Sequence, residues 1–180
     1  MPRLMILVNG LPGAGKTTLA SRLAPELDAV LVSKDKIKEA LADAPELAPE
    51  LVGSLGAAAM ETAWSIAQDV PGSVVVESWW FAPRDRGHLQ AALERVRAER
   101  VVEVWCDATV HVARRRFSER ARHAIHNDAE RLATDWDHWA QHAQPLALCP
   151  VVTVRTDRDV DVRSLAREIA CGGRFSHDTG

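Results

Sequence analysis

The stretch LMILVNGLPGAGKTT, residues 4–18, decides the fold of this chain. Its first part, Leu4–Asn9, is a mostly apolar run of strand type, and Gly10–Thr17 then fits the pattern GxxxxGK[ST]. The residues after Gly15 carry apolar side chains at helical spacing. A strand, a glycine-rich turn and a helix in this order predict a phosphate-binding loop, and this context argues against a chance glycine-rich turn.

Each residue type in the loop has a physical reason to be there. Glycines let successive backbone N–H groups turn inward around a phosphate, and the start of the helix adds its positive dipole end. Lys16 can bridge the β- and γ-phosphates of ATP, or of GTP in its place, and act in catalysis, while the Thr17 hydroxyl can bind Mg²⁺. Nucleotide contacts are therefore expected from Gly10, Pro12, Gly13, Ala14, Gly15, Lys16, Thr17 and Thr18.

The bulk properties of the chain limit the other possibilities. Its 180 residues are enough for one sizeable core and too few for two ordinary domains. No run approaches the roughly 18 to 20 apolar residues of a membrane span, and the N-terminus lacks the pattern of a secretory signal, so a cytoplasmic protein is expected. The separated cysteines predict neither a disulfide framework nor a zinc site, and the formal charge of −3 gives no overall attraction to nucleic acid.

Short apolar runs alternate along the chain with longer segments of helical period, which is typical of βαβ units in a parallel sheet. Most of these runs are continuous, as expected for strands that helices cover on both faces, and the pattern predicts a three-layer α/β fold. Turn residues interrupt residues 43–56, where mobility is expected, before a helix around Ala57–Gln68. The expected strands are Leu4–Asn9, Ala29–Val32, Ser73–Glu77, Val101–Trp105 and Val151–Arg155.

A carboxylate, Asp35, comes directly after the second expected strand and opens a helix. Because the carboxyl ends of parallel strands face the ligand, we expect Asp35 near the γ-phosphate, where an acceptor hydroxyl must lie. There it can accept the hydroxyl proton and align the oxygen for attack. The alternative is a helix N-cap, although no Glu or Gln stands three residues later to complete a capping box.

The third expected strand ends in Glu77, and an aromatic run follows it. A carboxylate at this place is the layout of an acid that holds Mg²⁺ through water, and we also expect Glu77 to lie against the acceptor. An ion pair with helix arginines is the alternative. Trp79 and Trp80 are candidates to stack on the acceptor, although adjacent aromatic residues often only pack. Arg84 and Arg86 are candidates to reach a phosphate or the acceptor.

An arginine-rich segment, residues 110–124, is expected to form one helix that acts as a lid. On a helical wheel Arg116 and Arg120 lie along one flank, whereas Arg115 and Arg122 point away towards solvent. Guanidinium groups suit the place where charge develops on a transferred phosphoryl group, so Arg116 and Arg120 are expected to be catalytic. Arg116 is also expected to contact the nucleotide and Arg120 the acceptor. A solvated basic face and a nucleic-acid contact are the alternatives.

These residues together resemble a known group, the small P-loop kinases of the adenylate-kinase-like type. The group includes chloramphenicol phosphotransferase, zeta-type toxins and the kinase domain of polynucleotide kinase, and the sequence looks most similar to actinobacterial antibiotic phosphotransferases that act on capuramycin-type nucleosides. The resemblance extends from Leu4 to about Ala170. It implies a five-stranded parallel sheet with the strand of the phosphate-binding loop in the centre.

The resemblance also implies roles for particular residues. It places an aspartate base at Asp35, matches the lid pattern RxxxR to Arg116 and Arg120, and assigns adenine contacts to Thr156 and Asp157. The chain departs from the group at position 77, where relatives often carry Asp, and in the aromatic run 79–81, where many carry smaller polar residues. The departures weaken any transfer of acceptor specificity.

The expected organisation is one kinase domain, residues 1–170, with a helical lid at about 110–127 and a flexible tail at 171–180. The expected activity is transfer of the γ-phosphate of ATP to a hydroxyl of a small molecule, such as a nucleoside-type antibiotic in a resistance mechanism. A 5′-hydroxyl polynucleotide kinase and a nucleotide-dependent switch are the alternatives. A carboxylate base that faces an acceptor favours the kinase, and neither nucleic acid nor a membrane is expected as a partner.

Overall fold

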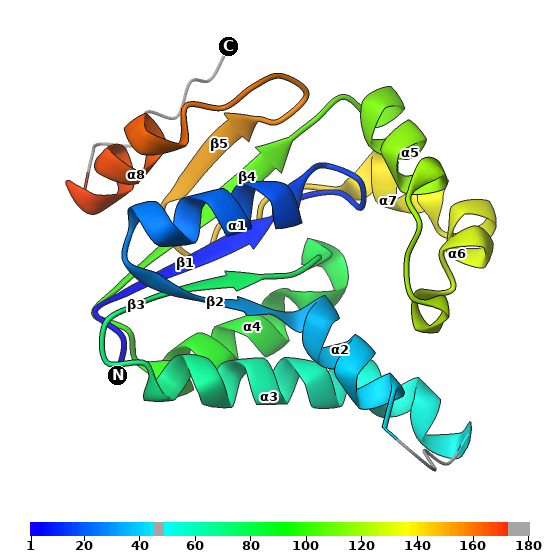
Figure 1. Cartoon of the computed structure of the whole chain (residues 1–180), viewed down its shortest axis with the longest axis horizontal. Coiled ribbons are helices and arrows are strands. Elements are labelled where there is room, and N and C mark those ends of the chain that lie inside the picture. The colour runs from blue at the N-terminus through cyan, green and yellow to red at the C-terminus, as the bar shows by residue number, and fades with distance from the viewer. Residues whose placement is uncertain (45–48, 173–180) are drawn as a thin grey trace.

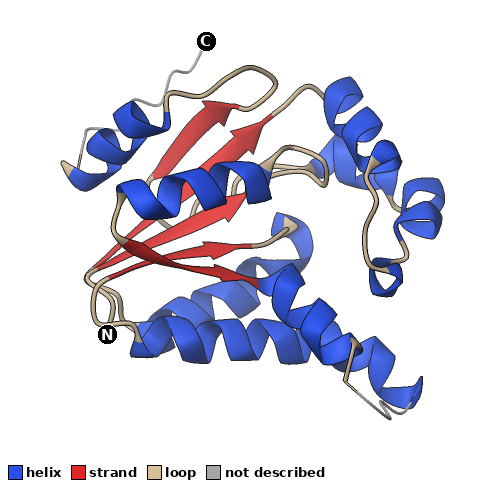
Figure 2. Ribbon diagram, in the orientation of Figure 1, coloured by secondary structure: helices blue, strands red, loops and turns tan. Residues whose placement is uncertain are grey.

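Five apolar runs of the sequence form one parallel sheet in the computed structural model, which describes residues 1–44 and 49–172. In the sheet the order is β2-β3-β1-β4-β5, so the strand before the phosphate-binding loop lies in the centre. All five arrowheads point towards the same edge (Figure 2). The predicted fold class is confirmed. The strands are β1 (Leu4–Asn9), β2 (Ala29–Ser33), β3 (Ser73–Glu77), β4 (Arg100–Asp107) and β5 (Val151–Arg155).

Helices cover both faces of this sheet and one of its edges. Helices α1 and α8 lie on one face and α3 and α4 on the other, whereas α5, α6 and α7 lie beyond the carboxyl ends of the strands (Figure 1). No helix in the described ranges is both long and apolar enough to cross a membrane. The helices are α1 (Lys16–Glu26), α2 (Lys34–Ala42), α3 (Leu55–Asp69), α4 (Ala82–Val96), α5 (Val110–Glu119), α6 (Asp128–Thr134), α7 (Trp136–His142) and α8 (Val162–Ala170), with 3₁₀ turns at Pro49–Ser54 and Ala124–His126.

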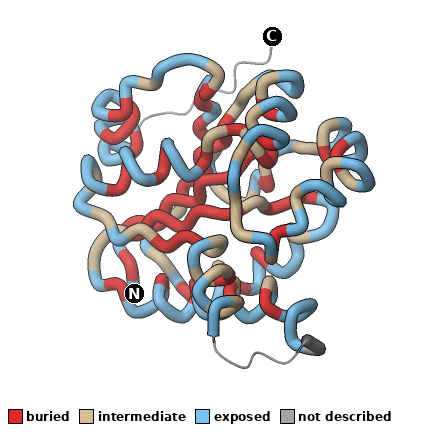
Figure 3. The backbone as a smooth tube through the Cα atoms, turned by 45° about the vertical axis from the view of Figure 1, so that its right-hand side comes forward, coloured by how far each residue is buried: buried red, intermediate tan, exposed pale blue. Residues whose placement is uncertain are grey.

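The central strand β1 shows why the apolar runs are continuous. Leu4, Ile6 and Val8 pack into the core under α1 and α8, whereas Met5 and Leu7 pack into the core under α3 and α4. Each fully buried side chain of this kind contributes about 1.5–3 kcal/mol through the hydrophobic effect. Buried residues accordingly concentrate along the strands (Figure 3). The sheet is thus a firm base for the loops at its carboxyl edge.

The predicted boundaries differ from the structure in a few places. Strand β4 extends beyond Val101–Trp105, because Arg100 pairs with Leu4 of β1 and Asp107 pairs with Arg155 of β5. Of the segment 43–56, where mobility was expected, residues 45–48 lie outside the described residues. The expected tail also lies outside them from residue 173 onward.

The largest difference concerns the lid, because residues 110–124 do not form one helix. Helix α5 ends at Glu119, Arg120 has extended backbone, and a 3₁₀ turn follows at Ala124–His126. Beyond Glu119 the side chains of Arg120 and Arg122 bind carboxylates of other segments. The helical wheel that pointed Arg122 towards solvent is therefore wrong, since this side chain is only 19% exposed and faces α2.

Candidate active site

The phosphate-binding loop joins β1 to α1 and needs glycine for two separate reasons. Gly10 and Gly13 have φ angles of 143° and 83°, which side-chain-bearing residues rarely adopt. A Cβ at Gly13 would also lie 2.1 Å from the backbone oxygen of Ala113 on α5. At Gly10 it would lie 2.6 Å from the backbone oxygen of Cys106 on β4. The loop therefore packs closely against α5 on one side and β4 on the other.

A buried polar pair beneath the loop holds its first residue in place. The side-chain oxygen of Asn9 accepts hydrogen bonds from the backbone N–H groups of Gly10 at 2.8 Å and Trp80 at 3.0 Å. Its amide nitrogen donates to the carboxylate of Glu103 at 3.0 Å. Glu103 is fully buried and accepts further backbone hydrogen bonds from residues 146 and 147. We did not identify this pair from the sequence, although a carboxylate within a buried strand is a usable signal.

Lys16 is a buried cation at the mouth of the loop. Its ammonium group donates to the carbonyl oxygens of Gly10 at 2.9 Å and Leu11 at 3.1 Å. Burial lowers the pKa of Lys16, and the charge of Glu77 opposes this shift. Within the described residues its hydrogen-bond partners are carbonyl oxygens, so a bound phosphate would offset the cost of burying the charge. The loop therefore fits a nucleotide phosphate.

The side chains suited to Mg²⁺ meet beside Lys16. The Thr17 hydroxyl donates to one oxygen of Glu77 at 3.2 Å, and the Ser33 hydroxyl donates to the other at 2.7 Å. In the described ranges no group of three or more His, Cys, Asp or Glu residues is arranged to hold a metal. Mg²⁺ in nucleotide sites uses one or two protein ligands together with phosphates and water, so Thr17 and Glu77 fit this ion.

Asp35 lies in the first turn of α2, and the Arg122 guanidinium binds its carboxylate. The N-cap residue of α2 is Ser33, so the structure does not support the capping alternative for Asp35. Burial alone would raise the pKa of Asp35, but neighbouring cations, first Arg122 and then Lys34, outweigh it and hold the pKa below its usual value. Asp35 is therefore ionised at neutral pH and can accept a hydrogen bond from a hydroxyl group.

The two lid arginines of the predicted RxxxR pattern reach the site in different ways. Arg116 donates to the backbone oxygen of Thr156 at 3.0 Å, next to the end of β5. Arg120 is bound by the carboxylate of Asp128 at 2.9 Å, and its guanidinium lies 4.4 Å from the centre of the Phe117 ring. Both arginines line the cavity beside the phosphate-binding loop. Their catalytic roles stay a prediction.

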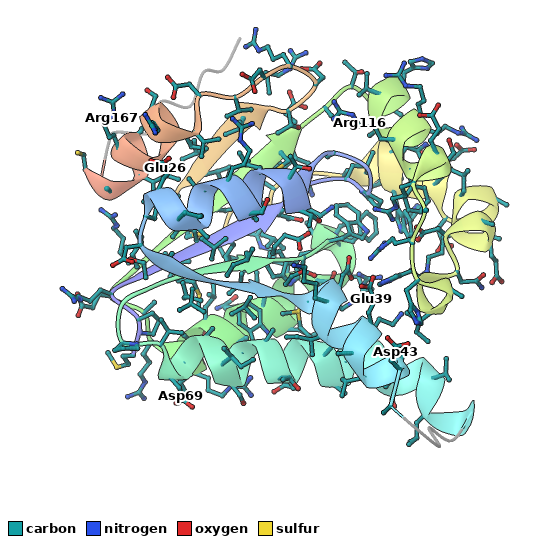
Figure 4. All side chains as sticks on the ribbon, in the orientation of Figure 1. Glu26, Glu39, Asp43, Asp69, Arg116 and Arg167 are labelled. Atoms are coloured by element: carbon teal, nitrogen blue, oxygen red, sulfur yellow. The ribbon has the colours of Figure 1, made fainter. Side chains whose placement is uncertain are left out.

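Arg122 and the residues after it connect the lid to α2. Arg122 binds Asp35 and also contacts His126 at 3.0 Å, and His126 in turn contacts the Glu39 carboxylate at 2.7 Å. His123 contacts Asp43 at 3.0 Å near the far end of the same helix. Figure 4 shows Glu39 and Asp43 on the side of the molecule where the lid lies. The lid is therefore closed over α2.

Two cavities meet under this closed lid. The first, which we call the P-loop cavity, has a volume of 390 Å³ and is lined by the phosphate-binding loop, Ser33, Glu77 and the lid arginines. The second, which we call the tryptophan cavity, has a volume of 510 Å³ and extends between α2, α3, α4 and α7. The residues that line both cavities are Lys16, Asp35, Arg120 and Arg122.

Aromatic side chains form one wall of the tryptophan cavity. Trp80 is stacked on Trp64, with ring centres 6.0 Å apart, and is almost fully buried. Trp79 meets Trp139 edge-on at 6.2 Å. Both residues of the predicted pair thus pack against other aromatic rings and also line the cavity. Contact between them and an acceptor stays a prediction.

The remaining predicted residues divide between the site and the surface. Arg84 lines the tryptophan cavity, whereas Arg86 lies on the exposed face of α4 and lines neither cavity. The Thr156 side chain is buried beside Gly15, and its hydroxyl has no hydrogen-bond partner in the described residues. Asp157 is bound by Arg155 at 2.6 Å. The adenine contacts expected from Thr156 and Asp157 stay a prediction.

Comparisons with known proteins agree with this geometry. A family model described as an AAA domain, AAA_33, matches residues 5–146. No curated protein matches this sequence. Among solved structures, a candidate kinase from Chloroflexus aurantiacus J-10-fl is 26% identical, and the match covers 93% of this chain and 96% of that one with a TM-score of 0.74.

Two further structures share the fold at lower identity. Shikimate kinase from Bacteroides thetaiotaomicron is 18% identical, with a TM-score of 0.62 and coverage of 92% of this chain and 96% of that one. The tunicamycin resistance protein of Deinococcus radiodurans is 15% identical, with a TM-score of 0.51 and coverage of 96% of both chains. These two likenesses show the fold alone.

Proposed function

Because this chain belongs to the AAA_33 family, we propose that it is a phosphotransferase that moves the γ-phosphoryl group of ATP onto a hydroxyl of a small molecule. The observation that carries the proposal is that Asp35 and Lys16 line both cavities at once. A carboxylate between a phosphate-binding loop and a second cavity has the place of a base between donor and acceptor. A nucleotide-dependent switch needs no second cavity of this kind.

The residues at the junction of the two cavities have different roles in phosphoryl transfer. Asp35 accepts a hydrogen bond from the acceptor hydroxyl and takes its proton as the oxygen attacks phosphorus and the bond to the β-phosphate breaks. Lys16 and Arg120, which line both cavities, would stabilise the negative charge that develops on the oxygens of the transferred group. ATP with Mg²⁺ supplies the phosphoryl group, and Thr17 and Glu77 are the residues that would hold the ion.

The walls of the tryptophan cavity support an acceptor with a flat ring. Its volume of 510 Å³ lies in the usual range for small-molecule sites, and Trp79 offers an aromatic surface near Lys16, whose ammonium is 5.8 Å from the ring centre. Within the class of small hydroxyl compounds, a nucleoside-type antibiotic phosphorylated as a means of resistance is the finer proposal. Compounds of this type combine a planar base with sugar hydroxyl groups.

The test begins with a screen of the purified chain. ATP and Mg²⁺ are offered with nucleosides, aminoglycosides and oligonucleotides as hydroxyl acceptors, and phosphorylated product is identified by mass spectrometry. Asp35→Asn is then compared with the unchanged protein on the best acceptor. Because the amide keeps the size of the side chain but cannot take the proton, kcat should fall about 10²-fold or more, with ATP affinity unchanged.

A matched control separates this effect from a general loss of negative charge. Asp69→Asn removes a carboxylate at the end of α3, on the other side of the molecule from the lid (Figure 4). This variant should keep its kcat. An Asp35→Asn protein with normal kcat would show that Asp35 is not the base.

A further inference from the structure

Among the described residues that line the tryptophan cavity, not every cationic side chain has a carboxylate partner of its own. Arg84 is paired with Asp85 at 2.7 Å, and the lining carboxylate Glu61 is paired with Arg95 at 2.9 Å. Arg120 is held by Asp128, as described above. Among the described residues, and apart from Lys16 and Arg122 at the junction of the two cavities, the lining cations outside these pairs are Lys34, Lys38 and Arg131.

Lys34 and Lys38 lie four residues apart on α2 and therefore on the same side of that helix. Lys38 is only 9% exposed, and its one hydrogen-bond partner in the described residues is the backbone oxygen of Ile125 at 3.0 Å. An ammonium group carries three donors, so further donors are available. Lys34 lies 3.6 Å from one oxygen of Asp35, whose other oxygen is bound by Arg122, so two cations share this one carboxylate.

Arg131 approaches the same place from α6, across the cavity. Its guanidinium lies 5.9 Å from the centre of the Trp139 ring, which also lines the cavity. Burial lowers the pKa of Lys38, and the nearby charges of Lys34 and Arg131 lower it further. Three cations that repel one another around a partly enclosed space would be stabilised by an anion between them.

The first turn of α3 adds to this positive region. Gly56 lines the cavity, and a Cβ at Gly56 would lie 4.0 Å from the Lys34 ammonium. Helix α3 has 15 residues, and its N-terminal end, where Gly56 lines the cavity, carries the positive end of the helix dipole. The helix end and the lysines therefore favour the same kind of ligand.

From this geometry we propose that the acceptor is a small hydroxy compound that also carries a carboxylate or a phosphate, held by Lys34, Lys38 and Arg131. The inference rests on the proposed function, since it places the hydroxyl at Asp35. Lys38 is three residues beyond Asp35 on α2, so the anion lies about one helical turn, ~5 Å along the axis, from the reacting oxygen. Polycationic acceptors such as aminoglycosides are excluded by the same charges.

A binding experiment tests the anion site without any reaction. The full chain is saturated with ADP and Mg²⁺ to fill the P-loop cavity, and benzoate, phenyl phosphate and uncharged benzyl alcohol are titrated while tryptophan fluorescence is measured. Trp79 and Trp139 line the cavity and report its occupancy. The charged probes should bind about 10-fold more tightly than benzyl alcohol. The better of the two charged probes identifies whether carboxylate or phosphate is the natural group.

Variants connect this preference to the named residues. Lys38→Gln and Arg131→Gln should each remove most of the preference for the charged probes. Lys38→Arg should keep it, which separates the loss of charge from a loss of the Ile125 contact. Arg115→Gln removes one charge from the exposed face of α5 and should leave the preference unchanged.

A second experiment uses transfer itself. A nucleoside and its 3′-monophosphate, which share a free 5′-hydroxyl, are compared as acceptors. The charged member should have a KM about 10-fold lower at similar kcat, and Lys38→Gln should raise its KM while leaving that of the nucleoside unchanged. Phosphorylation of oligonucleotides alone would overturn the proposal of a small acceptor.

The outcomes distinguish the anion site from the proposed function. Equal affinity for benzoate, phenyl phosphate and benzyl alcohol would overturn the anion site, even if a neutral hydroxyl compound were phosphorylated. A charge preference that disappears in Lys38→Gln, together with no transfer to any acceptor, would leave the anion site standing and remove the phosphotransferase.

Discussion

The phosphate-binding loop and the lid both present cations to the same point, yet they are held in different ways. Lys16 of the loop is held by the backbone oxygens of Gly10 and Leu11, six and five residues away in the chain. Arg122 of the lid is held by the carboxylate of Asp35, which is 87 residues away. The loop is thus shaped by its own backbone over a buried sheet, whereas the lid depends on partly exposed ion pairs. Such ion pairs contribute little stability individually. The contacts that hold the lid should therefore break more readily than those that hold the loop.

The largest expected effect comes from the loop. Lys16→Ala should lower kcat about 10³-fold or more, because no other residue of the loop brings a charge to the transferred phosphate. Phosphate transfer is measured with saturating ATP, and circular dichroism checks that the variant is folded. Near-normal turnover would remove the loop from catalysis.

A second change disrupts the close packing of the loop against α5 at Gly13. Gly13→Ala should destabilise the protein by about 3 kcal/mol, since the new Cβ meets the Ala113 oxygen and the positive φ is unfavourable for alanine. Thermal unfolding measures the loss. Gly87→Ala on α4 is the control, because a Cβ there meets nothing within 4 Å and alanine favours a helix. Equal melting temperatures for the two variants would contradict the close approach of α5 to the loop.

The lid arginines should have a smaller effect, directed at the transition state. Arg116→Ala and Arg120→Ala should lower kcat about 10- to 10²-fold and change ATP affinity less, because charge redistributes on the phosphoryl oxygens only during transfer. Steady-state kinetics and nucleotide binding together give this split. Arg115→Ala, on the exposed face of α5, is the internal control. Similar losses in all three variants would make the lid merely a basic surface.

The smallest expected effect is a pH dependence of lid closure. Burial, the charge of Arg122 and the charge of Lys38 lower the pKa of His126 below 6.5. The hydrogen bond that the Glu39 carboxylate accepts from His126 and the charge of Asp35 oppose this shift. A group with a lowered pKa binds its proton more readily when released, so the closed lid loses stability as pH falls below about 6.5. Above that pH the closed lid keeps its full stability.

Hydrogen exchange of residues 120–126 measures this opening. Exchange, corrected for its intrinsic pH dependence, should show weaker protection at pH 5.5 than at pH 7.5, and His126→Gln should remove most of the difference. Asp35 does not contribute in this window, because its pKa lies below its usual value of 3.8. A pH effect that persists in His126→Gln would assign it to another group.

Site residues whose place depends on their position along the chain could be predicted, whereas those placed by contacts between distant segments could not. The phosphate-binding loop, Glu77 at the end of its strand, and Asp35 follow from positions along the chain, because parallel strands bring their carboxyl ends to one edge. The orientation of Arg122 could not be predicted from a helical wheel. Its wheel position assumed that α5 continues, but the helix ends at Glu119, and Arg122 then binds Asp35, 87 residues away in the chain.

The sequence by itself determined the fold class, the strand Leu4–Asn9 and the phosphate-binding loop, since these depend on contiguous residues whose period and glycine spacing have local physical causes. Only the tertiary structure decided how the lid closes over α2 and which cations of the tryptophan cavity have no carboxylate of their own among the described residues. Those features depend on contacts such as Lys38 with Ile125, 87 residues apart, and on which carboxylates are already taken by other arginines. The sequence allows many pairings among its charged side chains. Only the fold, by bringing a few of these side chains close together, decides which pairings form.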